Sequence, residues 1–206
     1  MMTLLDRTST DTFREGSTPV LETERLCLRA PRLEDAKQIA ALVNDRRIAE
    51  NTIRIPHPYA IADAREWIGA TNEPGGERSF VVTIAGEIIG ACGFHGRDGM
   101  PEIGYWLGVP FWGNGYATEM ARALIDHAFG DRGHDVLVAG ARVSNPASRR
   151  VLEKCGFQWT GVGLYRIRAI QSSAPFDRFR LERRIWASLK SWGASRPKQP
   201  ASRCKS

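Results

Sequence analysis

Residues 112–119, with the sequence Trp-Gly-Asn-Gly-Tyr-Ala-Thr-Glu, have the composition of an anion-binding turn. Gly113 and Gly115 can adopt backbone angles that other residues avoid, and an apolar stripe at helical spacing begins at Ala117. A run of aromatic and branched residues typical of a strand, Ile103–Val109, precedes the turn. A strand that leads through a glycine turn into a helix leaves N–H groups unpaired at the helix N-terminus, where the helix dipole also attracts anions. This arrangement suits a pyrophosphate.

The elements that would position this turn follow from hydrophobic periodicity. A helix that starts at Asn145 and Pro146 is predicted from N-cap and first-turn preferences, and Gly156 suits its C-terminal end. The order of elements predicts an α/β (mixed α+β) domain with a mixed, mostly antiparallel sheet of about seven strands and helices on both faces. The strands are expected at 25–29, 79–84, 87–94, 103–109, 135–143, 157–168 and 176–186, and the other helices at 33–43, at 61–71 and from 117.

Composition and charge indicate one domain with two polar ends. The 206 residues carry a formal charge of +6, and residues 190–206 contain five basic residues and no acidic one. We expect a flexible leader at 1–20, a folded domain at 21–189 and a basic disordered tail at 190–206. A nucleic-acid role for the tail is an alternative, although direct nucleic-acid binding is not expected.

The four cysteines and the apolar runs bear on the cellular location. No two cysteines form a Cys-x-x-Cys pair, so neither a zinc site nor a disulfide framework is indicated. No apolar run approaches the length of a membrane span, and the first residues lack the pattern of a secretory signal. We therefore expect a cytoplasmic protein without a metal or a membrane partner.

Three motifs of this chain, in their relative positions, resemble those of the GNAT superfamily of N-acyltransferases. Within that superfamily they resemble the Rim-type enzymes, which acetylate ribosomal proteins at their N-termini. The first is the turn at 112–119. The second is Glu102-Ile-Gly-Tyr-Trp-Leu, directly before it, and the third is the Asn-x-x-Ser pattern at 145–148 that continues through Glu-Lys-x-Gly-Phe at 153–157. The segment Leu21–Leu26 also fits, and the similarity spans about residues 21–189.

This resemblance implies a single GNAT-like domain that uses acetyl-CoA as cosubstrate. It implies that the fourth and fifth strands splay apart, that the pantetheine arm lies between them near Leu107–Val109, and that the turn at 113–118 holds the pyrophosphate. A Cβ atom at Gly115 is expected to clash, and Asn114 stands where many members carry a charged Arg or Lys. The expected cofactor-binding residues are Leu107, Val109, Trp112, Gly113, Asn114, Gly115, Tyr116, Ala117, Thr118 and Asn145. Arg149, Arg150 and Lys154 could meet the 3′-phosphate, although solvated charges are favoured for at least two of them.

The resemblance also implies the catalytic residues. Glu102 is the candidate base, Ser148 is the candidate donor to the departing sulfur, and the N–H of Val109 is expected to stabilise the oxyanion. The non-catalytic alternatives are a solvated carboxylate at a strand edge for Glu102 and an ordinary residue in the first turn of a helix for Ser148. The alternative acids, for each of which packing is favoured, are Tyr105, Tyr116 and Tyr165.

The acceptor is expected to be a primary amine, most readily a protein N-terminal α-amine such as that of a ribosomal protein. An N-terminal amine has a pKa of about 8 and a lysine amine one of about 10.4, so the first needs less help from a base. A small amine acceptor (an aminoglycoside or a polyamine) and a non-catalytic CoA-binding or sensor domain are the alternatives. His57, Tyr59 and Trp67 are candidate acceptor-wall residues, a surface role is favoured for His95, and a homodimer is a further expectation by resemblance.

Overall fold

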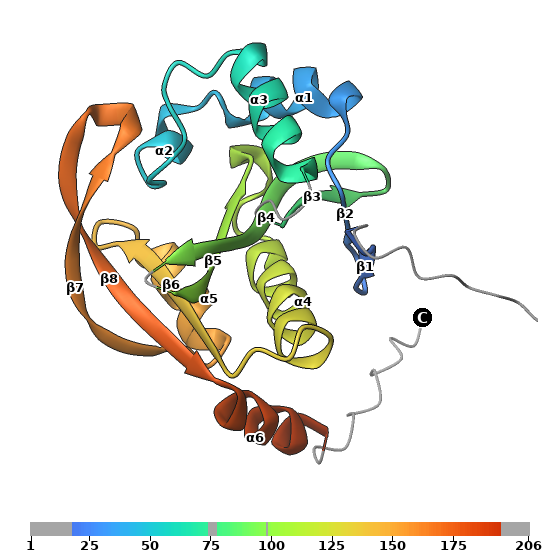
Figure 1. The fold of residues 1–206 in the computed structure, drawn as a ribbon, viewed down its shortest axis with the longest axis vertical. Helices are drawn as coiled ribbons and strands as arrows, with labels where there is room; N and C mark the ends of the chain where they lie inside the picture. Colours follow the sequence, from blue (N-terminus) through green and yellow to red (C-terminus); the bar gives the residue numbers. More distant parts are fainter. Residues whose placement is uncertain (1–17, 74–77, 98, 195–206) are drawn as a thin grey trace, which may run out of the picture.

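The computed structural model describes residues 18–73, 78–97 and 99–194. Eight strands of these residues form one sheet in the order β1-β2-β3-β4-β5-β6-β8-β7, and all neighbours are antiparallel except β5 and β6 (Figure 1). The predicted mixed, mostly antiparallel sheet is therefore confirmed, with the two-residue strand β1 as the addition. The strands are β1 Leu21–Glu22, β2 Cys27–Arg29, β3 Ser79–Ile84, β4 Glu87–Arg97, β5 Met100–Leu107, β6 Val136–Arg142, β7 Gln158–Ile167 and β8 Ser172–Glu182.

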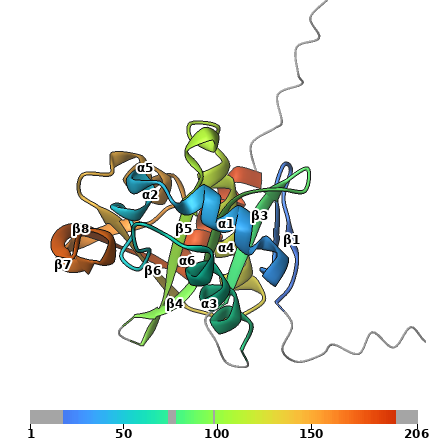
Figure 2. The ribbon, with the colours of Figure 1, turned by 90° about the horizontal axis from the view of Figure 1, so that it is seen from above.

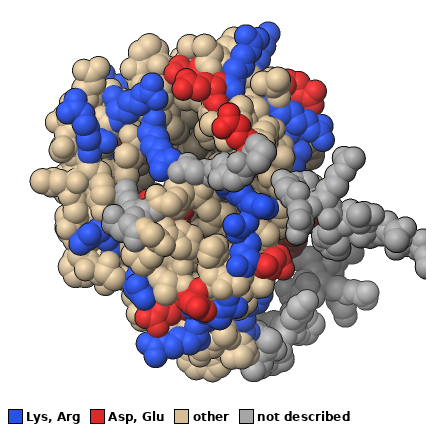
Figure 3. Space-filling view, in the orientation of Figure 1, with Lys and Arg blue, Asp and Glu red and all other residues tan. Residues whose placement is uncertain are grey.

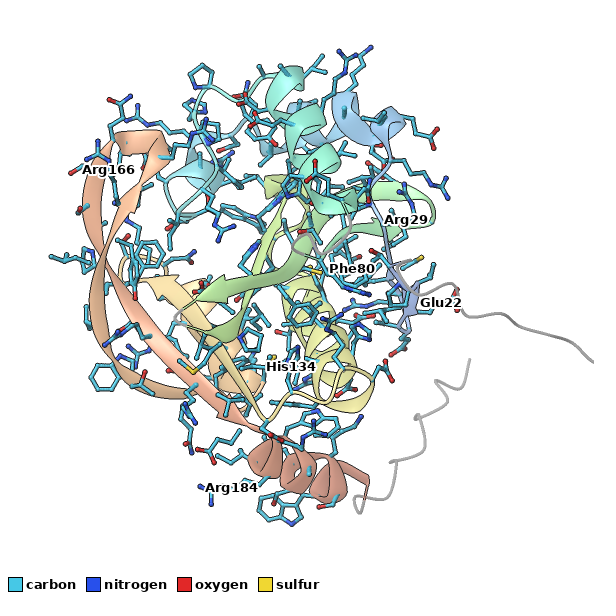
Figure 4. All side chains as sticks on the ribbon, viewed as in Figure 1. Glu22, Arg29, Phe80, His134, Arg166 and Arg184 are labelled. Carbon is cyan, nitrogen blue, oxygen red and sulfur yellow. The ribbon has the colours of Figure 1, made fainter. Side chains whose placement is uncertain are left out.

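Helices cover both faces of the sheet, as Figures 1 and 2 show. Strand alternation explains how two cores form, because successive side chains point to opposite faces. Phe80, labelled in Figure 4, packs in the core that α4 covers, whereas Val81 packs in the core beneath α1 and α3. The helices are α1 Ala36–Val43, α2 Arg46–Ala49, α3 Ile61–Asn72, α4 Tyr116–Gly130, α5 Pro146–Lys154 and α6 Arg183–Ala194, with 3-10 turns at η1 Leu33–Asp35, η2 Val109–Phe111 and η3 Arg168–Ile170.

The predicted splay lies between β5 and β6. These strands pair only at Glu102 with Val138 and at Ile103 with Ala139. From Gly104 to Leu107, β5 remains paired with β4 but has left β6. The sheet therefore opens in its middle, immediately after Ile103, and this opening lies between the fourth and fifth strands of the sequence prediction.

The C-terminal segment differs from the prediction. Residues 176–186 were expected to form one strand, but β8 ends at Glu182 and α6 begins at Arg183. The prediction was wrong because the short alternating run does not distinguish a strand end from an amphipathic helix. Trp186 shows what holds the helix: its indole Nε1 donates to Asp126 Oδ1 at 2.7 Å, and its ring lies 5.4 Å from that of Phe129. Helix α6 also runs five residues into the expected tail, of which 195–206 lie outside the described residues, as does most of the expected leader.

Gly156 follows the end of α5 and packs against α6. It has φ +91°, and a Cβ atom at this position would lie 2.4 Å from Cδ1 of Leu189 on α6. We expect Gly156→Ala to lower the free energy of unfolding by about 1–3 kcal/mol, because the new side chain meets both a disfavoured conformation and a neighbour. Urea denaturation measures this effect. Gly130→Ala is the matched control, because Gly130 lies at the end of α4 with open space around it and should be neutral or slightly stabilising. Equal losses in both variants would contradict the explanation.

None of the helices in the described part of the chain is both long and apolar enough to span a membrane.

Candidate functional site

A cleft of about 1040 Å³ lies where the sheet opens. Figure 3 shows the hollow on this face, between the surfaces formed by α2 and α3. Residues from β5, from the turn before α4 and from the N-terminus of α5 line it. The predicted site residues that line the cleft are Glu102, Leu107, Trp112, Gly113, Gly115, Tyr116, Ala117, Thr118, Asn145 and Ser148.

The glycine turn has the backbone geometry that the sequence predicts. Gly113 has φ +80° and Gly115, the N-cap residue of α4, has φ +81°. A Cβ atom at Gly115 would make only an ordinary contact, 3.5 Å from Nη2 of Arg25, and one at Gly113 would meet no atom of the described residues within 4 Å. The clash expected at Gly115 concerns a bound pyrophosphate and stays a prediction, since a Cβ atom there meets no steric conflict with the described residues. Glycine is required here because residues with a side chain rarely adopt a positive φ.

Trp112 ties the turn to the end of β5. Its side chain is 45% exposed, and its indole Nε1 donates to the carbonyl oxygen of Leu107 at 2.8 Å. The Leu107 carbonyl, which belongs to the stretch Leu107–Val109 where the pantetheine arm is expected, thus already uses one of its two acceptor positions. The indole also lies 5.9 Å from the guanidinium carbon of Arg47 on α2. Trp112 therefore fixes the turn relative to the open strand in addition to lining the cleft.

Ser148 meets a tyrosine on the α4 side of the opening. The hydroxyl oxygens of Tyr105 and Ser148 are 3.0 Å apart, and Tyr105 also donates to the Ser148 carbonyl at 3.3 Å. Asn145 acts as the predicted N-cap, since its Oδ1 accepts from the N–H of Ser148 at 3.1 Å. Burial raises the pKa of Tyr105 far above its usual value, although the hydrogen bond with Ser148 opposes this. Tyr105 is therefore a neutral hydroxyl that can orient Ser148.

Glu102 faces the other side of the sheet, and His95 stands beside it. The two residues are register partners on β5 and β4. The imidazole of His95 extends over the neighbouring glycine, since a Cβ atom at Gly104 would lie 3.1 Å from its Nε2. Nδ1 of His95 lies 3.5 Å from Nη1 of Arg54, and all three side chains belong to residues that line the cleft. His95 is therefore half-buried in the wall of the cleft.

The wall beyond Glu102 is aromatic and charged. Tyr59 and Trp67 line the cleft as expected, together with Asp63 and Glu66 on α3 and Arg168 in η3. Burial, reinforced by the negative charge of Asp63, raises the pKa of Tyr59 to about 12. His57, the third expected wall residue, is not among the lining residues. The cleft thus has two ends, a glycine turn suited to phosphate and an aromatic wall carrying both signs of charge.

The remaining candidates divide into residues that line the cleft and residues that do not. Val109 begins η2, and neither it nor Asn114 is among the lining residues. Arg150 and Lys154 line the cleft, whereas Arg149 is bound to Glu153 and Asp177, at 2.9 and 3.3 Å. No group of three or more His, Cys, Asp or Glu residues in the described ranges could hold a metal ion.

Comparison with known proteins identifies the family. The profile of the acetyltransferase (GNAT) domain matches residues 25–158. The N-acetyltransferase p20 of Bacillus licheniformis is 33% identical over 150 residues, which cover 69% of this chain and 84% of that protein.

Two of the solved structures with a similar fold have names that state an activity. RimL, a ribosomal L7/L12 alpha-N-protein acetyltransferase in complex with coenzyme A, has a TM-score of 0.71 and 20% identity and covers 82% of this chain and 99% of its own. The microcin C7 self-immunity acetyltransferase MccE, in complex with acetyl-CoA and AMP, has a TM-score of 0.66 and 23% identity and covers 78% of this chain and 93% of its own. The family match shows that this chain belongs to the GNAT acetyltransferases and is an acetyl-CoA-dependent N-acetyltransferase.

Proposed function

We propose that this chain acetylates the α-amine at the N-terminus of a protein, by direct transfer in a ternary complex. The observation that carries the proposal is that Glu102 and the Tyr105–Ser148 pair line one cleft from opposite faces of the opened sheet. A carboxylate can thus approach the attacking amine while a hydroxyl approaches the leaving group. The name of RimL, which has the same fold, supports an N-terminal acceptor.

The residues of the turn fit the donor. Gly113, Gly115 and the first N–H groups of α4 would hold the pyrophosphate, because a helix N-terminus with positive-φ glycines directs backbone donors toward an anion. The opening after Ile103 would admit the pantetheine arm. Bound acetyl-CoA supplies a thioester, whose carbonyl carbon accepts the amine and whose thiolate departs.

Glu102 would take the proton from the amine. A protonated N-terminal amine, with a pKa of about 8, needs only about 1 kcal/mol to become neutral at pH 7. A single carboxylate, acting directly or through a water, is sufficient for that task. Glu102 lies at the last paired positions of β5 and β6, so its side chain is held at the edge of the opening. This position would bring the base close to the point at which the two substrates meet.

Ser148 would donate a hydrogen bond to the sulfur as the C–S bond breaks. A thiol has a pKa of about 8.5, so its thiolate is a good leaving group and full proton transfer is not required. Tyr105, held neutral by burial, would donate its one hydroxyl proton to Ser148 Oγ during this step, so that the Ser148 proton points to the sulfur. In this arrangement Ser148 contacts the reacting atoms, and Tyr105 is a positioning residue.

We expect Ser148→Ala to lower kcat about tenfold and to leave the Kd for acetyl-CoA within about twofold, since the hydroxyl acts on the leaving group. Tyr105→Phe should give a smaller loss, and the double variant should be no slower than Ser148→Ala, because both side chains act through one hydroxyl. Steady-state kinetics and calorimetry measure these quantities. Losses that multiply in the double variant would show that Tyr105 acts independently of Ser148.

The acceptor class is tested by acetyl-CoA-dependent thiol release with a panel of amines. The panel contains peptides with free N-termini, the same peptides with blocked N-termini and one internal lysine, and also polyamines and aminoglycosides. We expect the highest kcat/KM with free N-termini. Turnover confined to the small amines would replace the proposed acceptor with a small molecule, a candidate that the immunity role in the name of MccE favours. Acetyl-CoA binding without turnover of any amine would favour a sensor domain.

A further inference from the structure

Arg25, in the segment between β1 and β2, contacts the glycine turn through its side chain. Figure 4 labels Glu22 and Arg29, which lie on either side of this segment at the edge of the sheet. The Arg25 side chain is 42% exposed and lines a second depression, which shares Gly115 and Thr118 with the main cleft, whereas Arg25 lines the second depression alone. Its guanidinium carbon lies 4.6 Å from the ring centre of Tyr116, the first residue of α4. One side chain from the start of the domain thus meets the turn that precedes α4.

The contact with Asn114 fixes one peptide group. Nη1 of Arg25 donates to the carbonyl oxygen of Asn114 at 3.1 Å. In a planar trans peptide the C=O and the following N–H point in opposite directions. Because the Asn114 carbonyl points toward Arg25, the N–H of Gly115 points away from it. Gly115 lines both depressions, so an N–H directed away from Arg25 is available to an anion in the main cleft.

The contact with Glu119 neutralises a charge in the first turn of α4. Oε1 of Glu119 accepts from the Thr23 hydroxyl at 2.7 Å and from the Arg25 backbone N–H at 2.9 Å. Oε2 accepts from Nε of Arg25 at 2.7 Å and pairs with its Nη2 at 2.6 Å. Partial burial acts to raise the pKa of Glu119, but the hydrogen bonds from Thr23 and Arg25 outweigh it and hold the pKa below its usual value.

An ionised carboxylate so close to the helix N-terminus would repel a diphosphate unless a cation accompanied it. Arg25 is that cation, and its planar fork engages the carboxylate and the turn simultaneously. We propose that Arg25 is a positioning residue for acetyl-CoA, which orients the Gly115 N–H toward the pyrophosphate and cancels the charge of Glu119 beside it. This role rests on the cofactor and is independent of which amine is acetylated.

The test compares two donors. We expect Arg25→Gln to raise the Kd for acetyl-CoA at least about tenfold, measured by calorimetry. The Kd for S-acetylpantetheine, which lacks the pyrophosphate, should change less than about twofold when measured by ligand-observed NMR. Arg25→Lys, which keeps the charge but not the fork, should give an intermediate loss for acetyl-CoA. Arg32→Gln is the matched control, because Arg32 is 64% exposed and pairs with Glu34 at 3.3 Å outside both depressions.

Comparing the two ligands distinguishes a positioning role of Arg25 at the pyrophosphate from a general loss of folded structure. Weakened binding of both ligands to the same extent would show that Arg25 only stabilises the fold, and an unchanged Kd for acetyl-CoA would remove the role entirely. If Arg25→Gln does not fold, Arg25→Lys decides the matter by the same comparison of acetyl-CoA with S-acetylpantetheine. The double variant Arg25→Gln/Glu119→Gln gives a further check. Removing the uncompensated carboxylate should recover part of the lost affinity, and no recovery would contradict the charge-cancelling part of the role.

Discussion

Replacing Gly115 with valine is expected to raise the Kd for acetyl-CoA about 100-fold. Gly115 has φ +81° at the N-cap of α4, and a β-branched residue would need about 2–3 kcal/mol to keep that conformation. The chain avoids this cost by turning the peptide, and the N–H groups then no longer converge on the pyrophosphate. A loss of 2.7 kcal/mol in binding corresponds to the stated factor. Isothermal calorimetry with acetyl-CoA measures the change directly.

Gly133→Val is the matched control for this prediction. Gly133 also has a positive φ, +68°, with open space around it, but it lies in the loop after α4 and is not among the cleft-lining residues. The two variants should lose similar free energy of unfolding, and only Gly115→Val should lose affinity. An unchanged Kd in Gly115→Val would mean that the turn does not hold the pyrophosphate.

The second large effect is expected for Glu102→Gln. The variant should lower kcat/KM at pH 7 about 100-fold for the preferred N-terminal peptide, which is the usual contribution of a positioned base. The amide occupies nearly the same volume as the carboxylate but cannot accept a proton, so the Kd for acetyl-CoA should not change. Glu87→Gln is the control, because Glu87 begins β4 on the same hairpin, is exposed, and lies outside the cleft.

The pH dependence distinguishes a base from a binding residue. Below the amine pKa of about 8 most acceptor molecules are protonated and the reaction depends on Glu102. Above that pKa the amine is already neutral and needs no base. The ratio of wild-type to variant kcat/KM should therefore be largest near pH 6 and should shrink toward pH 9. A ratio that stays constant over this range would remove Glu102 as the base, although it would leave a role in binding.

Local patterns were sufficient to predict the turn and the elements around it. Gly113 and Gly115, the strand before them and the apolar stripe after them are neighbours in sequence, so their geometry is largely encoded there. The N-cap at Asn145 was predictable for the same reason. The extent of the splay, in contrast, follows from where β5 and β6 stop pairing, a feature for which the sequence contained only a family resemblance.

Residues distant in sequence were harder to predict. Arg25 lies some 90 positions before the turn it contacts, and its alternating strand pattern contained no sign of that role. The position of His95 was predictable from the hairpin turn near Gly99, which makes Arg97 the partner of Met100. Moving two residues away from the turn on both strands places His95 opposite Glu102. The α6 prediction was wrong because packing of Trp186 on α4, rather than periodicity, decides its conformation.

The early end of the β5–β6 pairing leads us to expect that the cofactor stabilises the folded chain. After Ile103, no strand among the described residues pairs with β5 on its β6 side, so the amide groups of β5 there exchange with solvent more readily than those of a fully paired strand. A ligand that binds only the folded chain stabilises it by about 2.7 kcal/mol when present at 100 times its Kd. The resistance of this protein to heat and to proteases is therefore expected to rise with the concentration of acetyl-CoA, so that its abundance follows the metabolic supply of its own substrate.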